Sequence, residues 1–225
     1  MVTLIKDTLI EKVPDYDVVL VPMGIHNSFN CGFCYEVGLN FPEIKEREKS
    51  ESPYGDKRKY GTIFPVRVGK TVFCLCYVHN TGFKKDADGR FLDMVALKSC
   101  LEAVVRRFSG RRIASPVLGA EKCDGNGDRA EIIRVFESIF NETDVDLYDY
   151  EQRDYAQELF REIASLHALS KAHEISGDEY DRRRSEIEWR RRNGIFKPMP
   201  EGYRYKPRKY DYDGVIRVTK KDLDD

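Results

Sequence analysis

The sequence predicts an α/β fold in which helices cover both faces of a mainly parallel sheet, with some antiparallel additions. Strand patterns alternate with helical periodicity along the first 150 residues. Residues 18–21 are too apolar for a strand with one wet face, so the sheet must be covered on both sides. Glycine-bearing loops at 22–33 and 119–128 each follow a strand. Because ligands of such sheets lie beyond the carboxyl ends of the strands, we expect these loops to flank one crevice.

The first half of the chain contains four predicted strands and one interrupted helix. Residues 34–48 have helical character that breaks at Pro42, and Gly69 followed by Lys70 indicates a hairpin. Residues 46–61 are charged and rich in turn residues, so we expect a surface connection there. The predicted strands lie within 2–13, 15–24, 61–69 and 70–79, and polar loops occupy 25–33 and 80–90.

The next segment adds two helices and two strands. Apolar residues recur at helical spacing from Leu92 to Val104, and a second amphipathic pattern follows Asp128. The predicted helices are 90–108 and 128–140, and the predicted strands are 111–119 and 144–150.

The character of the chain changes after residue 150, so we predict three segments: a domain at 1–150, a helical hairpin at 151–197 and a partly ordered tail at 198–225. One helix is marked by apolar residues and the other by aromatic and apolar residues: Leu159, Ile163, Leu166 and Leu169, then Tyr180, Ile187 and Trp189. The arginine runs 182–184 and 190–192 alternate with acids. They fit a solvated helix face or, alternatively, a patch for RNA or a protein partner.

Composition excludes several function classes. The 38 basic and 39 acidic residues leave a net charge of -1, so no global field attracts nucleic acid or an acidic membrane. No apolar run approaches the roughly 20 residues of a membrane span, and we expect a cytoplasmic protein. Cys31 and Cys34 resemble half of a zinc site, but Cys74 and Cys76 lie in an apolar strand without metal-knuckle spacing. We therefore expect no metal and no cofactor.

The second loop has the glycines of a phosphate site, at Gly119, Gly125 and Gly127. Its spacing matches neither the dinucleotide fingerprint nor the P-loop, so an ordinary loop before a helix remains an alternative. Asp128 is placed to cap the following helix. Asp124 lies too far before that helix to cap it, which leaves it available to a ligand.

The first loop carries side chains suited to a sugar. Asn27 and Asn30 are candidates to hold ribose hydroxyls, and Phe33 is a candidate to cover a sugar face. The alternative is a polar turn in which glycine supplies positive φ. His26 and His79 fit ordinary loop and strand-end positions as well as catalytic ones.

Taken together, the segments "DVVLVPMG", "NSFNCGFCYEVGLNFPEI", "CLCYVHNTGF", "LKSCLEAV", "SPVLGAEKCDGN" and "VDLYDY" resemble a macrodomain, the three-layer α/β/α module that binds ADP-ribose. The nearest branch holds terminal ADP-ribose protein glycohydrolases, DNA ADP-ribosyl glycohydrolases and ADP-ribose-1''-phosphate phosphatases. The resemblance covers about residues 2–150 and gives no counterpart for the tail.

The resemblance implies site residues. The distal ribose would meet the glycine run, here Asn30, Cys31 and Gly32, with Phe33 as the apolar residue that follows it. Asp7 would contact the adenine, with Tyr148 as the aromatic residue nearby, and Asp124 lies within one residue of the acid that this branch uses in catalysis. The diphosphate loop would consist of Pro116, Leu118, Gly119 and Ala120, with Gly125 in the same loop.

The sequence also departs from the family pattern. One glycine of the usual run is present, Ala120 and Glu121 replace the usual small residue and glycine, and Gly24 stands where many macrodomains carry a ribose-binding Asn. The glycohydrolase Lys is replaced by His79 and Asn80, so we do not expect a Lys–ribose Schiff base.

Two functions follow as hypotheses. As a hydrolase, the protein would act on ADP-ribose-1''-phosphate or on ADP-ribose attached to protein or nucleic acid. Asp124 would activate water or stabilise the ribose cation, and His79 or His26 would donate a proton. As a binding module, it would recognise ADP-ribose or a related nucleotide, and the helical tail would dock a partner. A third hypothesis is a scaffold that kept the fold and lost the site. We favour hydrolysis, with ADP-ribose or a derivative as the ligand and no membrane partner.

Overall fold

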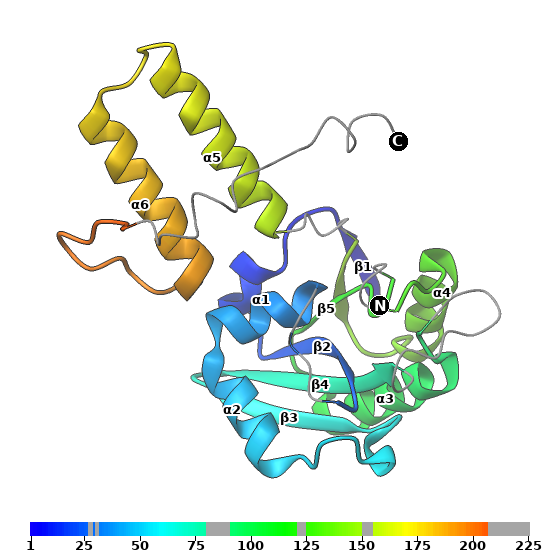
Figure 1. Cartoon of the computed structure of the whole chain (residues 1–225). Helices are drawn as coiled ribbons and strands as arrows, with labels where there is room; N and C mark the ends of the chain where they lie inside the picture. Colours follow the sequence, from blue (N-terminus) through cyan, green and yellow to red (C-terminus); the bar gives the residue numbers. More distant parts are fainter. Residues whose placement is uncertain (27–28, 30–31, 80–90, 121–124, 150–154, 207–225) are drawn as a thin grey trace, which may run out of the picture. The chain divides into compact units, whose positions relative to one another are not determined.

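The computed structural model describes the chain except for residues 27–28, 30–31, 80–90, 121–124, 150–154 and 207–225. Its described strands form one six-stranded sheet in the order β1-β6-β5-β2-β4-β3 (Figure 1). β3 is antiparallel to β4, and the other neighbours are parallel. The strands are β1 (Val2–Ile5), β2 (Val18–Gly24), β3 (Ile63–Val68), β4 (Thr71–His79), β5 (Ile113–Pro116) and β6 (Val145–Tyr148). The predicted mixed sheet and its hairpin at Gly69 are confirmed.

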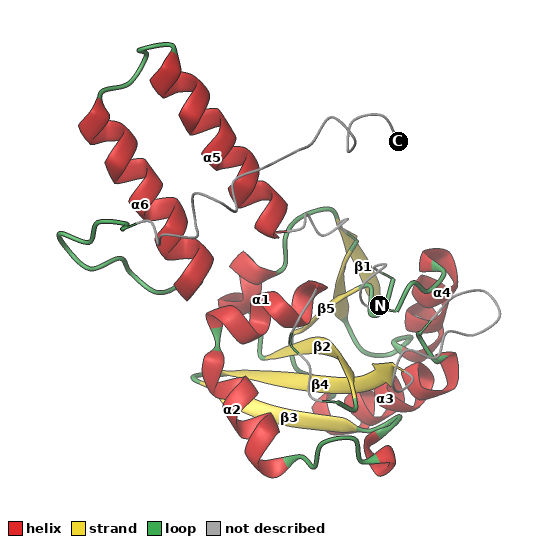
Figure 2. Ribbon diagram, in the orientation of Figure 1, coloured by secondary structure: helices red, strands yellow, loops and turns green. Residues whose placement is uncertain are grey.

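Helices cover both faces of this sheet, which confirms the three-layer α/β/α class (Figure 2). Apolar residues of α3 (Met94–Phe108) and α4 (Arg129–Ile139) pack in one core cluster with Val18 and Leu20 of β2. On the other face, the ring of Phe41 lies 4.6 Å from that of Phe73 in β4. Phe41 separates α1 (Gly32–Asn40) from α2 (Pro42–Glu51), so the predicted break at Pro42 is confirmed.

The two helical layers meet opposite faces of β2, because successive side chains of a strand point to opposite faces of the sheet. Side chains at i and i+2 share a face, so Val18 and Leu20 point to α3 and α4, whereas Val19 and Val21 point to the opposite face. All four are buried. The run at 18–21 is therefore apolar throughout because each of its residues meets a helical layer.

Residues 46–61 are not simply the surface connection that their charges predicted. α2 continues to Glu51, and a 3₁₀ helix, η2 (Lys57–Lys59), follows it. Glu48 and Lys59 are both buried, and they form an ion pair with 3.3 Å between Lys59 Nζ and Glu48 Oε1. Most of this stretch is exposed as predicted, but the prediction was wrong for Glu48 and Lys59, because each charge finds its partner inside the fold, which a local charge pattern does not reveal.

The chain divides into two compact units, Met1–Tyr155 and the part from Ala156 onward. In the second unit, α5 (Tyr155–Lys171) and α6 (Gly177–Asn193) follow one another as predicted, and the Ser176 hydroxyl accepts a hydrogen bond from the N–H of Glu179. Leu166 and Ile187 are buried, while the side chain of Leu159 lies outside the described residues. Within the described part of the chain, no helix is both long and apolar enough to cross a membrane.

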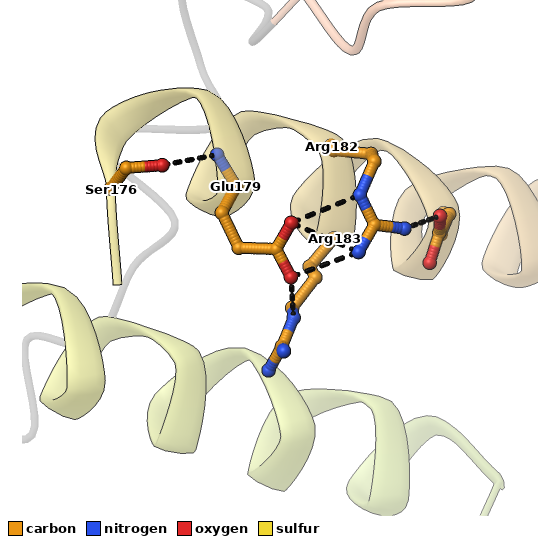
Figure 3. A network of polar contacts seen from close by, with 5 residues as sticks. Ser176, Glu179, Arg182 and Arg183 are labelled. Carbon is orange, nitrogen blue, oxygen red and sulfur yellow. Dashed lines mark hydrogen bonds and ion pairs between the residues drawn. The ribbon is translucent and has the colours of Figure 1, made fainter. Parts of the chain in front are cut away.

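Within the described part of the chain, five of the six arginines of α6 form ion pairs with acids of the same unit, and Arg192 lies over the ring of Tyr205. Glu179 accepts hydrogen bonds from Arg182 and Arg183, which hold the pKa of its carboxyl below the ordinary value (Figure 3). Further ion pairs join Arg182 to Glu186, Arg184 and Arg191 to Glu188, and Arg190 to Glu162. This pairing favours an internally neutralised set of charges, partly buried at Arg184 and Glu188, over a patch for nucleic acid.

Candidate functional site

The carboxyl ends of β2 and β5 form the topological switch point of the sheet. These two strands are neighbours, but the chain leaves β2 for α1 on one face and leaves β5 for α4 on the other. Ligands of open α/β sheets bind outside the carboxyl ends of such strands. The two predicted loops therefore start from the same place in the sheet.

Two prolines end the hydrogen bonding between β2 and β5. The N–H of Val18 donates to the carbonyl of Arg112 at 3.1 Å, which sets the alternation of the parallel ladder. Beyond the pairing of Val19 with Ala114, the next donors toward the partner strand would come from positions 22 and 116, and both are proline. Pairing accordingly stops at Val19 and Ala114, whereas β2 remains paired with β4 as far as Gly24. At the switch point, therefore, β2 and β5 continue without hydrogen bonds to one another beyond Val19 and Ala114.

The glycines of the second loop allow its backbone to fold on itself. Gly119 has φ of 76°, and the N–H of Ala120 closes a turn onto the Val117 carbonyl at 3.1 Å. The N–H of Gly127 then donates to the Gly119 carbonyl at 2.9 Å. A Cβ on Gly125 would lie 2.5 Å from that carbonyl oxygen, so only glycine fits there. These glycines allow the backbone of the loop to approach itself closely, which is a structural role separate from any contact with a ligand.

The loop is held by its neighbours as well. The carbonyl of Gly125 accepts hydrogen bonds from the N–H groups of Phe91 and Leu92, at 2.7 and 3.1 Å. Asp128 caps α4 by accepting a hydrogen bond from the N–H of Glu131 at 2.8 Å, so its predicted structural role is confirmed. Pro116 and Leu118 are buried and Ala120 is half-buried, while Asp124 lies outside the described residues.

Asp7 and Tyr148 lie at the carboxyl ends of β1 and β6, two neighbouring strands on the β1 side of the switch point. Ile5 of β1 and Pro116 of β5 flank Tyr148 in the ladder, and Asp7 follows β1 by two residues. The side chain of Tyr148 is 6% exposed, and its hydroxyl lies 2.9 Å from that of Tyr16. Burial raises the pKa of Tyr148, the hydrogen bond with Tyr16 opposes this rise, and the charges of Asp146 and Asp7 add to it. The two residues assigned to the adenine are therefore electrostatic neighbours.

The contacts of these residues limit what each can offer. The Tyr16 hydroxyl donates to Asp146 at 2.8 Å, so Tyr148 is the donor in the bond between the two tyrosines. Asp7 is exposed and accepts a hydrogen bond from the N–H of Thr8 at 2.7 Å. An ion pair between Arg129 of α4 and Asp149 ties the helix after the second loop to the residue after β6.

The first loop begins beside β4. Gly24 is the ladder partner of His79, and a Cβ on Gly24 would lie 3.7 Å from that of His79. His79 is half-buried and forms an isolated bridge with Leu92, so the structure brings it next to the exit of β2. His26 meets the ring of Tyr54, with 5.0 Å between centroids. Asn27, Asn30 and Cys31 lie outside the described residues.

Phe33 and Gly32 start α1 rather than project from a loop. Gly32 has φ of 58° at the first helical position. Phe33 is 1% exposed and belongs to the core. Its observed role is to pack α1 onto the sheet, which leaves little of its ring available to cover a sugar in this conformation.

Sequence analysis missed a buried polar cluster next to the first loop, formed by Glu48, Ser52, Lys59 and Tyr77. The Tyr77 hydroxyl donates to Glu48 Oε1 at 2.9 Å and lies 3.0 Å from the Ser52 hydroxyl. Burial raises the pKa of the Glu48 carboxyl, while the Tyr77 hydrogen bond and the Lys59 charge oppose that rise. The one available signal was Tyr77 itself, a polar aromatic in an otherwise apolar strand, because a buried hydroxyl needs a partner.

Replacing Lys59 should therefore destabilise the protein in a pH-dependent way. Lys59→Met removes the charge that offsets burial of Glu48, so the pKa of Glu48 should rise further above its ordinary 4.5. Losing one partner of a buried ion pair costs about 3 kcal/mol. At a pH above the folded-state pKa of Glu48, its carboxylate is charged and the full loss of stability is present. As the pH falls toward 4.5, Glu48 becomes protonated in the folded protein and the loss disappears.

Urea unfolding at pH 8 and pH 5, compared with wild type at each pH, tests this prediction. Lys57→Met is the control because Lys57 is an exposed lysine of the same 3₁₀ helix. An equal loss for Lys59→Met at both pH values would show that the lysine contributes packing rather than charge.

Among the described residues, no group of three or more His, Cys, Asp or Glu is placed to hold a metal ion. Cys74, Cys76 and Cys100 are buried thiols. Hydrogen bonds with Cys100 and Cys74, together with burial, raise the pKa of Cys76, so its thiol stays protonated. Cys31, the remaining part of the zinc alternative with Cys34, lies outside the described residues.

Solved macrodomain structures resemble this chain. The DarG macrodomain of Thermus aquaticus matches with a TM-score of 0.54 and 14% identity, over 66% of this chain and 98% of its own. The DarG macrodomain of Mycobacterium tuberculosis matches with a TM-score of 0.53 and 16% identity, over 66% and 97%. The chain has the macrodomain fold. At such identities the likeness establishes the fold alone.

A further similar structure is that of Thermosipho africanus DarTG, which was solved in complex with ADP-ribose. It matches with a TM-score of 0.55 and 14% identity, over 67% of this chain and 42% of its own. No protein-family model and no curated protein sequence matches the chain. The resemblance predicted from sequence motifs is therefore confirmed at the level of fold.

Proposed function

We propose that this macrodomain binds ADP-ribose at the switch point. The observation that carries the proposal is the second loop, whose backbone is folded tightly through Gly119 and Gly125 beyond the point where β2 and β5 stop pairing. Such a loop, followed by a capped helix, is suited to an anionic diphosphate. The ADP-ribose complex of the similar Thermosipho africanus protein supports this choice of ligand.

The ligand would run along the carboxyl edge of the sheet. The adenine would lie near Asp7 and Tyr148, and the diphosphate would lie against Pro116, Leu118, Gly119, Ala120 and Gly125. Because the N–H of Ala120 already closes a turn, the donors from this loop would be its other N–H groups. The distal ribose would meet Asn27, Asn30, Gly32 and the start of α1. Asp7 follows the last residue of β1, Ile5, by two positions, and Ile5 pairs with Tyr148, which supports the adenine end.

We further propose hydrolysis of the bond between the distal ribose and its 1'' substituent. Water would attack, Asp124 would take its proton, and His79 would donate a proton to the leaving group. The placement of His79 beside Gly24 supports a role at the distal end. The substituent would be phosphate, or an ADP-ribosylated protein or nucleic acid.

The second candidate is a binding module without catalysis. It is favoured by His79 and Asn80 standing where the glycohydrolase branch has its Lys. In that case the segments 151–197 and 198–225, which we propose as a helical appendage and a tail, would dock a partner. The buried thiols Cys74, Cys76 and Cys100 support a reducing, cytoplasmic setting for either function.

Binding is tested by thermal unfolding and calorimetric titration with ADP-ribose, ADP and NAD side by side. At a concentration 100 times the Kd, ADP-ribose should stabilise the protein by about 2.7 kcal/mol. If ADP raises the melting temperature less than ADP-ribose does, the distal ribose contributes part of the binding free energy. Absence of any shift at millimolar ADP-ribose would overturn the function and leave the fold intact.

A further inference from the structure

The buried polar cluster joins three elements near the first loop. Glu48 and Ser52 lie at the end of α2, Lys59 ends η2, and Tyr77 lies in β4. All four are buried. Lys59 Nζ lies 4.6 Å from the centroid of the Tyr77 ring, so the lysine rests on the tyrosine whose hydroxyl reaches Glu48. Burying this many polar groups is costly unless their geometry is kept, so the cluster fixes the relative placement of the three elements.

The cluster residues Ser52 and Lys59 lie at the two ends of the turn formed by residues 53–58. Ser52 holds one end of this turn through Tyr77, and Lys59 holds the other through Glu48. Lys59 also donates to the Pro53 carbonyl at 3.2 Å, which links the two ends directly. The turn is further ordered by Asp56, which accepts a hydrogen bond from the N–H of Arg58 at 2.9 Å.

The middle of the turn lies against the exit of β2. The N–H of Gly55 donates to the Ile25 carbonyl at 2.9 Å. The rings of Tyr54 and His26 meet edge to face, although Tyr54 is 75% exposed. Ile25 and His26 immediately precede Asn27, so this contact fixes the backbone from which the first loop departs.

We propose that the cluster is a positioning device for the first ligand loop, acting through the 53–58 turn on Ile25 and His26. The inference rests on the proposed function, because it assigns Tyr77 and its partners to the affinity for ADP-ribose without contact to the ligand. Tyr77 is thus a positioning residue.

The test compares Tyr77→Phe with Thr71→Val. Tyr77→Phe removes the hydroxyl that joins Glu48 and Ser52. Thr71→Val removes a buried hydroxyl at the opposite end of the same strand, where Thr71 donates to the Tyr16 carbonyl at 2.9 Å. Both lose a buried hydrogen bond, so both should lose stability. Measured well below both melting temperatures, Tyr77→Phe should weaken ADP-ribose binding about fivefold and Thr71→Val should leave it unchanged.

Hydrogen exchange gives a readout that needs no ligand. The Gly55 amide should exchange about fivefold faster in Tyr77→Phe and at the wild-type rate in Thr71→Val. Ser52→Ala, which removes the other hydroxyl of the same contact, replaces Tyr77→Phe if that variant does not fold. Unchanged exchange at Gly55 overturns the proposal, as does faster exchange with unchanged affinity. If wild type itself fails to bind ADP-ribose, the proposed function fails, and exchange at Gly55 alone decides whether the cluster holds the turn.

Discussion

Gly125→Ala should abolish measurable ADP-ribose binding and destabilise the protein by about 1–3 kcal/mol. The added Cβ would lie 2.5 Å from the Gly119 carbonyl oxygen and 3.0 Å from the Gly119 Cα. These are backbone atoms, so no side-chain rotation relieves the clash. Gly125 also has φ of 137°, which other L-residues rarely adopt.

Relieving the clash would disturb other hydrogen bonds of the second loop. The Gly119 carbonyl accepts from the N–H of Gly127, and the Gly125 carbonyl accepts from Phe91 and Leu92. Moving either glycine therefore breaks contacts that shape the proposed diphosphate site. Calorimetric titration measures the affinity, and urea unfolding measures the stability.

Gly177→Ala is the matched control. Gly177 is the first residue of α6, and a Cβ there meets nothing within 4 Å. It should leave binding unchanged and not destabilise the protein, because alanine favours helix over glycine. If Gly125→Ala binds ADP-ribose as wild type does, the second loop does not hold the diphosphate.

Asp124→Asn should lower turnover by roughly 10² to 10⁴ while the protein remains folded. Asparagine keeps the size of the side chain but removes the charge and the base. Asp124 directly precedes Gly125, whose carbonyl is anchored by two N–H groups. The sequence places Asp124 before the capping position, so stability should change by less than about 1 kcal/mol.

The assays are release of phosphate from ADP-ribose-1''-phosphate and release of ADP-ribose from modified protein and DNA. Asp128→Asn is the control, because it makes the same carboxylate-to-amide change four residues along the chain. Asparagine caps a helix about as well as aspartate, so this variant should keep both stability and turnover.

Three outcomes separate the hypotheses. Loss of turnover in Asp124→Asn but not in Asp128→Asn supports the catalytic assignment. Full turnover in Asp124→Asn rejects it and makes His79 the next residue to replace. Tight binding of ADP-ribose by a wild type that turns over none of the substrates supports the binding module.

Local chemistry in the sequence was sufficient for the strands and for most helices, and for several of their ends, although it missed η2 (Lys57–Lys59) and the last turn of α2. Pro42 separates two helices because proline lacks the N–H that a continuing helix needs. Asp128 caps α4 because a carboxylate accepts from the free N–H groups of a first turn. The apolar run at 18–21 indicated a strand covered on both faces, and β2 is buried on both.

Interactions between residues far apart in the chain were decided by the tertiary structure. Glu48 and Lys59 looked like surface charges, but the fold buries them against Tyr77, 29 and 18 positions away. Gly125 was expected to make room for a ligand, and it first makes room for the Gly119 backbone. Phe33 was assigned to a sugar face, and the fold places it in the core.

The sequence by itself determined which segments are strands and helices, because period, proline, glycine and capping residues act on their immediate neighbours. It also contained the reason that β2 and β5 separate, since Pro22 and Pro116 lack the donors that would join them. That both prolines fall just beyond the paired positions, however, depends on the strand order and register, which place Val18 opposite Ile113 and Val19 opposite Ala114. Register is set by pairing across the sheet and by burial on both its faces, so only the tertiary structure turned two separate prolines into the point where β2 and β5 stop pairing.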